Sequence, residues 1–347
     1  QSARRACRLG IFPLQAAEGR LMSALLEGIR ANNFVVVGRA GIDLYTDPGV
    51  ATEDAETVTV GLGGSSANIA AGICKLGGQA SLVTRVSDDS IGSYCIQQLK
   101  RYGVGTEYVT PVGGEYRNSL AFYESRVEGH RNVIYRNGAA DFQMDADNVA
   151  AVDYGKFGAL ITAGTVFAAE PSRSATFDAF DRAKAAGLPI IFDVDYRPYS
   201  WPSPQVAEEV LSRAAAASDM IVGNDEEFGF MAGGIEKGLE KAKALAASTA
   251  SIVVYKMGEK GAITFADGAE IHTGIWPVDA LKPTGAGDSF MAGMVTGLAE
   301  GQDLRDAILR GSACASVTVS RPGCAPAMAD TATLTKFMAE HAGPTDA

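Results

Sequence analysis

The chain alternates between short apolar runs and longer stretches whose apolar residues recur at helical spacing. "FVVVG" (34–38) is a β-branched run closed by glycine, which is typical of a buried strand. "SSANIAAGICKLGG" places Ile69, Ile73 and Leu76 on one helical face and ends in two glycines. The alternation continues with strand-like runs at 158–164, 188–195, 219–224 and 251–258, and helical stretches near 171–186, 204–217 and 236–248. This pattern predicts an α/β fold with a central, mostly parallel sheet flanked by helices.

Two stretches interrupt this rhythm. Residues 44–62 and 106–136 carry β-type residues and turns without long helical patterns, and the second contains "NSLAFYESRVEGHRNVIYR", a predicted hairpin. We interpret them as a small β-sheet lid that can close over a ligand, whose exposed edge would allow a homodimer. We expect residues 34–341 to form one domain, and the arginine-containing segment 1–33 to be an N-terminal extension outside the core.

Composition and charge narrow the class of partner. The 347 residues carry a net charge of −11, which argues against nucleic acid and anionic membranes as partners. No apolar run approaches the roughly 20 residues of a membrane span. The five cysteines are scattered and never in CxxC spacing, and the three histidines lie far apart, so a zinc site, a disulfide framework and a serine triad are all disfavoured. We expect a cytoplasmic protein that binds small molecules.

"LKPTGAGDSFMAGM" (281–294) combines a glycine-rich turn with a carboxylate. Gly285, Ala286 and Gly287 precede Asp288, and apolar residues then follow at helical spacing. The free N–H groups of such a turn and the helix dipole form an anion hole. Surrounded by donors, Asp288 is expected to stay ionised and able to accept a proton. The alternative is that Asp288 only caps the helix.

A second glycine pair stands in "VGLGGSSANIA" (60–70). Gly63 and Gly64 precede a helix that carries Asn68 in its first turns, an arrangement that lets a backbone approach a ligand, or else only a flexible loop. Phosphoryl transfer to an alcohol fits both glycine elements, with Asp288 as the base. The chain has no GxxxxGK[ST], so it is not a P-loop enzyme, and "VVVGRAGID" lacks the GxGxxG of a dehydrogenase.

Several separated motifs, in order, resemble the ribokinase/phosphofructokinase-B family of carbohydrate kinases over about 34–341. They are "GGSSAN", "NDEE", "YKMGEKGA" and "GAGDSFMAGM". The resemblance implies a ribokinase-like fold, ATP as phosphate donor and Mg²⁺ as metal, with Asp288 and the Gly285, Ala286 and Gly287 turn as catalytic elements. It also implies that Glu227, with Asn224, organises the metal through water. The remaining implied contacts are Lys256, Gly258, Gly261 and Lys282 for ATP, and Asp43, Gly63, Gly64 and Asn68 for the acceptor.

The arginines near these elements favour an acidic acceptor. "FDVDYRPYSW" resembles the D-x-[ND]-x-R-x-x-x-W pattern of sugar-acid kinases, with Arg197 at its centre, and Arg136 and Arg39 stand beside other predicted site elements. A guanidinium pairs bidentately with a carboxylate, although each arginine could instead bond a loop carbonyl or a surface carboxylate. The motifs together are most similar to kinases of 5-dehydro-2-deoxygluconate. Kinases of 2-keto-3-deoxygluconate, and a non-catalytic sugar-binding regulator, are the alternatives.

Lys282 departs from the family pattern. Most relatives have an aspartate there that helps hold a monovalent cation beside the anion hole, whereas a lysine repels a cation. We therefore expect the ammonium of Lys282 to replace the monovalent cation, with Pro283 stiffening the entry to the turn. The alternative is that Lys282 points to solvent and backbone carbonyls still hold the cation.

Overall fold

The computed structural model describes residues 12–124, 129 and 131–345. Its centre is a nine-stranded sheet in the order β13-β12-β11-β10-β9-β8-β1-β4-β5, parallel throughout except for β12 and β13. In chain order these strands are β1 (Asn33–Val37), β4 (Gln79–Ser87), β5 (Val109–Val112), β8 (Ala159–Ala163), β9 (Ile190–Asp193), β10 (Met220–Asn224), β11 (Ile252–Lys256), β12 (Ala262–Ala266) and β13 (Ala269–Thr273). The predicted α/β fold is confirmed.

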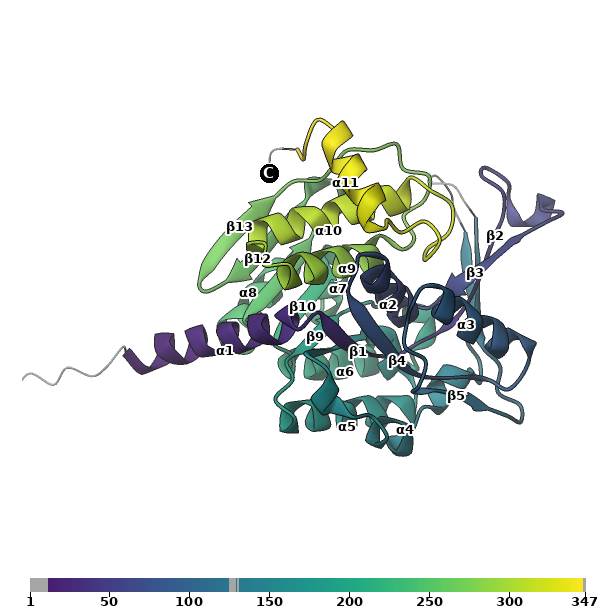
Figure 1. The fold of residues 1–347 in the computed structure, drawn as a ribbon, viewed down its shortest axis with the longest axis horizontal. Helices are drawn as coiled ribbons and strands as arrows, with labels where there is room; N and C mark the ends of the chain where they lie inside the picture. The colour runs from purple at the N-terminus through teal and green to yellow at the C-terminus, as the bar shows by residue number, and fades with distance from the viewer. Residues whose placement is uncertain (1–11, 125–128, 130, 346–347) are drawn as a thin grey trace, which may run out of the picture.

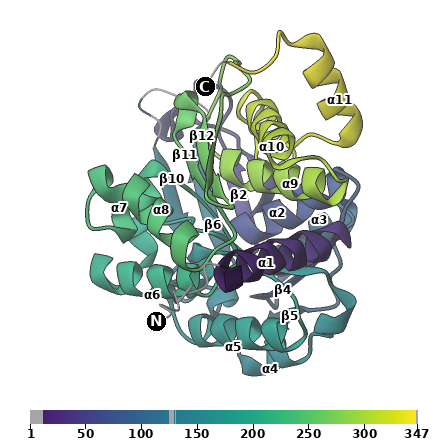
Figure 2. The ribbon, with the colours of Figure 1, turned by 90° about the vertical axis from the view of Figure 1, so that its left-hand side faces the viewer.

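Helices cover both faces of this sheet (Figures 1 and 2). Successive strand residues point to opposite faces, so Phe34 and Val36 belong to one buried cluster and Val35 and Val37 to the other. The first cluster is completed by α1 (Phe12–Arg30), α2 (Ser65–Lys75), α3 (Ser90–Arg101), α9 (Ala286–Ala299), α10 (Leu304–Val319) and α11 (Thr331–Glu340). The second is completed by α4 (Ala146–Ala150), α5 (Ser172–Ala185), α6 (Pro204–Ala216), α7 (Asp225–Met231) and α8 (Gly238–Ser248).

A separate four-stranded sheet extends to one side of the large one (Figure 1). Its order is β3-β2-β6-β7, formed by β2 (Gly41–Tyr45), β3 (Thr59–Gly63), β6 (Ser119–Tyr123) and β7 (Asn132–Tyr135). β6 and β7 form the predicted antiparallel hairpin, and residues 125–128 and 130 of its turn lie outside the described residues. The lid boundaries differ from those expected: β2 already begins at Gly41, and β5 pairs with β4 in the large sheet.

The N-terminal segment also differs from the expectation. Leu25 and Ile29, one helical turn apart near the end of α1, are buried in the core against the sheet. The last turns of the segment 1–33 therefore belong to the packed structure. Among the helices that the structure describes, none is long and apolar enough to cross a membrane.

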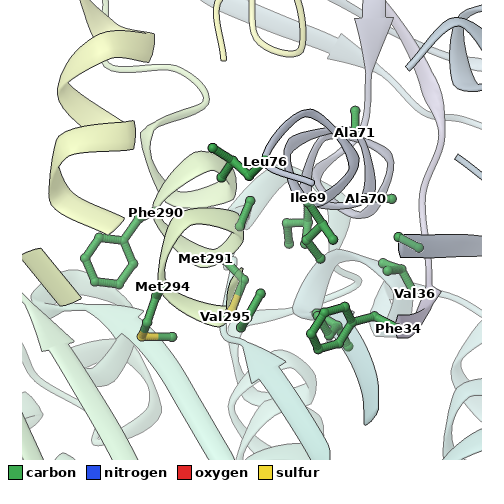
Figure 3. Packing of buried hydrophobic residues seen from close by; sticks show 14 of the residues in the cluster. Phe34, Val36, Ile69, Ala70, Ala71, Leu76, Phe290, Met291, Met294 and Val295 are labelled. Atoms are coloured by element: carbon green, nitrogen blue, oxygen red, sulfur yellow. The ribbon is translucent and has the colours of Figure 1, made fainter. Parts of the chain in front are cut away.

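Core packing fixes how α2 and α9 lie against each other. Ile69 of α2 and Met291 and Val295 of α9 lie between the two helices, over Phe34 and Val36 of β1 (Figure 3). Because interiors are close-packed, the relative position of the two helices is well defined. Their N-terminal turns carry two residues singled out in the sequence, Asn68 and Asp288.

Candidate active site

A cavity of about 780 Å³ opens at the carboxyl ends of the parallel strands. Arg39 follows β1, Asn224 ends β10 and Lys256 ends β11, and all three line the cavity. The register pairs Asn224 with Lys256. Ligands of open α/β sheets bind at this edge, and the volume suits a small-molecule site.

The turn before α9 leaves its first amides free. Gly285 has φ 82°, in the left-handed region that a side chain would strain, and no described side chain caps the helix that starts at Ala286. The free N–H groups and the helix dipole therefore make this end of the cavity attractive to anions. Asp288 makes no capping hydrogen bond to the start of α9. Its Oδ2 instead accepts a hydrogen bond from Asn68 Nδ2 at 2.9 Å. The capping alternative is wrong.

The charge state of Asp288 corrects a second expectation. Asp288 is partly buried in the wall of the cavity, and desolvation, followed by the nearby charge of Asp195, raises its pKa to about 7. The hydrogen bond from Asn68 opposes this rise without cancelling it. The carboxylate therefore titrates near neutral pH instead of staying fully ionised. Such a group is well matched to accepting a proton at physiological pH.

Two residues that line one end of the cavity carry buried oxygen atoms without hydrogen-bond donors. Asp43, 1% exposed, accepts from the hydroxyl of Tyr45 through Oδ2 at 2.8 Å. Its Oδ1 and the Oδ1 of Asn68 are buried without a hydrogen-bond partner among the described residues. Burial raises the pKa of Asp43 to about 6. Buried acceptors are normally satisfied, so Asp43 and Asn68 are candidates for binding the hydroxyl groups of a ligand.

Of the two glycines predicted to bind the acceptor, only one lines the cavity. Gly64 lines the cavity immediately before α2. Gly63 is not among the lining residues; it lies against Asp43, and a Cβ there would come within 2.0 Å of Asp43 Oδ1. Gly63 thus makes room for the carboxylate.

At the other end, Lys256, Gly258 and Gly261 line the cavity together with apolar residues. Lys256 Nζ lies 5.4 Å from the ring centroid of Phe290, and both residues face the cavity. Glu227, which would be a solvated helix residue if it had no role in the site, is instead 6% exposed. It forms a capping box with Asn224: Asn224 Oδ1 accepts from Glu227 N, and Glu227 Oε2 accepts from Asn224 N, each at 2.8 Å.

Comparison with known proteins identifies the family to which this chain belongs. A sequence profile described as pfkB family carbohydrate kinase matches residues 31–332. The chain belongs to the pfkB family of carbohydrate kinases. The kinase is 34% identical over 310 residues to a 5-dehydro-2-deoxygluconokinase of Photobacterium profundum, covering 87% of this chain and 93% of that relative. It is 33% identical over 315 residues to the enzyme of the same name from Geobacillus kaustophilus, covering 89% of this chain and 94% of that relative.

Solved structures agree on the fold of the kinase. A fructokinase double mutant from Vibrio cholerae O395, in a form bound to fructose, ADP and potassium ion, superposes with a TM-score of 0.77 at 25% identity, covering 88% of this chain and 98% of that chain. A fructokinase with bound ATP from Xylella fastidiosa gives a TM-score of 0.79 at 20% identity, with 89% and 99% coverage. The ribokinase-like architecture is thereby confirmed.

All three predicted arginines line the cavity of the kinase, but two are already paired. Arg136 forms an ion pair with the buried Asp141 and donates from Nη1 to Thr165 O at 2.7 Å. Arg197 Nη2 lies 2.8 Å from Asp195 Oδ1, and its Nη1 lies 3.8 Å from Glu227 Oε1. Arg39 Nη1 donates to Ser119 Oγ at 3.1 Å.

Two acidic residues of the site were not singled out from the sequence. Asp193 ends β9 and Asp195 follows it, and both are buried and line the cavity. Asp195 has φ 35°, a conformation that strains a residue with a side chain, and accepts from Thr165 Oγ1 at 3.2 Å. Burial raises the pKa of Asp193 well above its usual range. Two aspartates directly after a predicted buried strand in "FDVD" were the available signal.

The carboxylates that line the cavity of the kinase could bind a divalent metal ion only together with the phosphates of a bound nucleotide. Within residues 12–124, 129 and 131–345, no group of three or more His, Cys, Asp or Glu side chains is placed to hold an ion. Asp193 and Glu227 nevertheless present carboxylates to the cavity. Mg²⁺ commonly binds through one or two carboxylates, substrate phosphates and water, so the residues present fit that ion when a nucleotide accompanies it.

Lys282 of the kinase is almost completely buried, with 1% of its surface exposed. Its Nζ donates to Thr284 O at 2.6 Å and to Thr318 O at 3.3 Å. The alternative in which Lys282 points to solvent is therefore wrong. Burial lowers the pKa of Lys282, while Cys324, Asp43 and Asp288 act in the opposite direction.

Proposed function

We propose that this kinase transfers the γ-phosphoryl group of ATP to the primary hydroxyl of 5-dehydro-2-deoxy-D-gluconate, giving the 6-phosphate. The observation that carries the proposal is the pair of unpartnered acceptors on Asp43 and Asn68, with Asn68 bonded to Asp288 at the start of α9. Asp43 and Asn68 could hold the hydroxyl groups of a polyol. Its reacting hydroxyl would then lie beside Asp288, the proposed base, at the anion-attracting N-terminus of α9. The names of the relatives at 33–34% identity support this acceptor.

The chemical step follows from the positions of these groups. The hydroxyl oxygen of the acceptor forms a bond to the γ-phosphorus, its proton passes to a carboxylate oxygen of Asp288, and the bond to the β-phosphate oxygen breaks to release ADP. The amides of Ala286, Gly287 and Asp288 stabilise the charge on the transferring group. Asn68 holds the carboxylate of Asp288 in place.

Phosphates of the nucleotide are assigned to the end of the cavity that carries Lys256, Gly258 and Gly261. The solved relatives with ATP, or with ADP and a potassium or calcium ion, support a nucleotide and a metal. We assign Mg²⁺ to Asp193 and Glu227, with Asn224 acting through its capping box with Glu227. The metal would offset phosphate charge. We further propose that Lys282 replaces a monovalent cation, since its ammonium is held by two main-chain carbonyls.

A panel of acceptors tests the proposed function. We expect the highest kcat/KM for 5-dehydro-2-deoxygluconate when ADP release is measured against 2-keto-3-deoxygluconate, ribose, fructose and fructose 6-phosphate. Preference for 2-keto-3-deoxygluconate would favour the alternative sugar acid. Preference for a neutral sugar would refute an acidic acceptor, and absence of turnover with every acceptor would favour the sugar-binding regulator.

We also propose that the lid sheet pairs with a second copy of the chain. Its outer strands β3 and β7 expose apolar side chains, with Val60 46%, Val133 44% and Tyr135 62% exposed. Sedimentation velocity is expected to show a dimer that Val60→Lys with Val133→Lys converts to monomer. The matched double variant Leu21→Lys with Ile235→Lys, at exposed apolar positions outside the lid sheet, adds the same charge and is expected to stay dimeric. A monomeric wild-type protein at micromolar concentration would contradict the proposal.

A further inference from the structure

We propose that Arg39 is the residue that binds the carboxylate of the acceptor, and that Arg136 and Arg197 are positioning residues. This assignment rests on the proposed function, because it requires an acidic acceptor. The sequence pattern favoured Arg197, at the centre of its motif. The structure separates the three guanidiniums by what each already binds.

Arg136 and Arg197 have little charge left to offer a ligand. Arg136 is ion-paired with Asp141 through both Nε and Nη2, and its Nη1 donates to Thr165 O. Arg197 lies between Asp195 and Glu227 and donates from Nη1 to Tyr196 O at 2.9 Å. Each therefore holds a loop or a carboxylate of the site. A ligand carboxylate would have to compete with these internal partners.

Arg39 differs because its single bonded partner is neutral. It is 6% exposed, and the only hydrogen bond of its side chain to the described residues is the one from Nη1 to Ser119 Oγ. It forms no ion pair within 4.0 Å of any described carboxylate. A guanidinium has five N–H donors, and a buried charge is normally paired. Since Arg39 lines the cavity, its remaining donors are available to a ligand anion.

The charge of Arg39 is maintained by its surroundings. Burial lowers its pKa, but Tyr123, Asp141, Asp43 and Asp195 more than compensate and raise it. These acids act through space without contacting the guanidinium, so they keep it ionised and leave its donors free.

The main chain of Arg39 is fixed to the helix that carries Asn68. Arg39 O accepts from Ala67 N at 3.1 Å, in the first turn of α2. Ser119, which orients the guanidinium, is paired with Gly41 in the lid sheet, two residues before Asp43. The anion-binding group, the hydroxyl-binding Asp43 and the partner of Asp288 therefore belong to one connected unit. A sugar acid could place its carboxylate on Arg39, a hydroxyl on Asp43 and its far hydroxyl toward Asp288.

The local charge balance favours a carboxylate over a phosphate. Arg136 is balanced by Asp141, and Arg197 by Asp195. What is left at this end is one guanidinium close to Asp43, whose own charge Arg39 helps to stabilise. Because Asp43 already shares the charge of Arg39, a ligand carboxylate adds one negative charge at this end of the cavity, whereas a phosphate dianion would add two among the aspartates.

The test compares the acid with its C1 carboxamide, which keeps the shape and removes the charge. We expect Arg39→Gln to lower kcat/KM for 5-dehydro-2-deoxygluconate about 30-fold or more, mainly through KM, the scale expected for a charged hydrogen bond. The carboxamide should change less than about threefold under the same reasoning. Arg39→Lys, which keeps the charge but loses the planar fork, should restore part of the preference for the acid.

Three comparisons decide the outcome. Arg117→Gln, at an exposed arginine whose side chain donates to the carbonyls of Gly114 and Tyr116, should leave both substrates unaffected. Arg136→Gln and Arg197→Gln should lower rates for acid and amide alike. Equal losses for acid and amide in both Arg39 variants would overturn the assignment of Arg39. If the wild-type enzyme itself does not prefer the acid to the amide, or prefers fructose 6-phosphate, the proposed acidic acceptor fails first.

Discussion

Asp288→Asn is expected to lower kcat by about a hundredfold or more, the usual scale for loss of a general base, with little change in thermal stability. Asparagine keeps the size of the side chain and can still accept from Asn68, but it cannot take the proton of the attacking hydroxyl. Turnover of the proposed sugar acid, measured by ADP release under saturating substrates, checks the prediction. A variant with near wild-type kcat would remove Asp288 from the chemical step.

The matched control is Asp303, which also stands at the start of a helix. Its carboxylate caps α10 by accepting from Asp306 N at 2.9 Å. Asp303→Ala should lower the free energy of unfolding by about 1 kcal/mol and leave kcat unchanged, as expected for loss of a cap. A fall in stability without a fall in kcat at Asp303, and the reverse at Asp288, would separate capping from catalysis.

The pH dependence provides a second readout for Asp288. Because its pKa is raised to about 7, the carboxylate is protonated below that pH and cannot act as a base. We expect kcat/KM of the wild-type enzyme to rise with pH through about 7 and then level off, and the Asp288→Asn variant to lose this limb. A wild-type profile that stays flat from about one pH unit below neutrality to about one unit above it would contradict the assignment.

Local patterns predicted most of the secondary structure because hydrophobic periodicity depends on neighbouring residues alone. The strand at 34–38 and the helix carrying Ile69 and Ile73 appear where expected, as β1 and α2. Strand partners depend on residues far apart in the chain, and that is where the prediction failed. β5 has the composition of a lid strand, yet its register with β4 places it in the large sheet.

For the candidate site, the sequence likewise predicted which residues take part but not how they are buried or paired. Motifs located Asp288, Asn68 and Asp43, and the structure places all three along one cavity. Burial and pairing could not be predicted, since they arise only when distant segments meet. The raised pKa of Asp288, the pairing of Arg136 with Asp141 and the place of Gly63 against Asp43 all belong to this second kind.

The contacts of Lys282 also arise only in the folded chain, and they support the proposal that its ammonium replaces a monovalent cation. Its ammonium lies against Thr284 O, immediately before the turn, and Thr318 O, near the end of α10. Main-chain carbonyls pointing at one position are also ligands for a hard cation. Here a covalently attached positive charge already occupies that position. It joins the turn to α10 and lies close enough to Asp288 for their charges to interact.

We therefore expect wild-type turnover to be similar, within about twofold, in sodium, potassium and tetramethylammonium chloride at equal ionic strength, a difference of well under about 1 kcal/mol. Lys282→Asp removes the fixed ammonium and supplies a carboxylate, so its kcat should fall about tenfold or more in tetramethylammonium and recover in potassium. Lys75→Met is the control, because Lys75 Nζ also donates to main-chain carbonyls, such as Ala325 O at 3.1 Å, but lies outside the cavity lining. It should lower stability without creating a dependence on potassium. Strong activation of the wild-type enzyme by potassium would show that a free cation is still required and that Lys282 does not replace it.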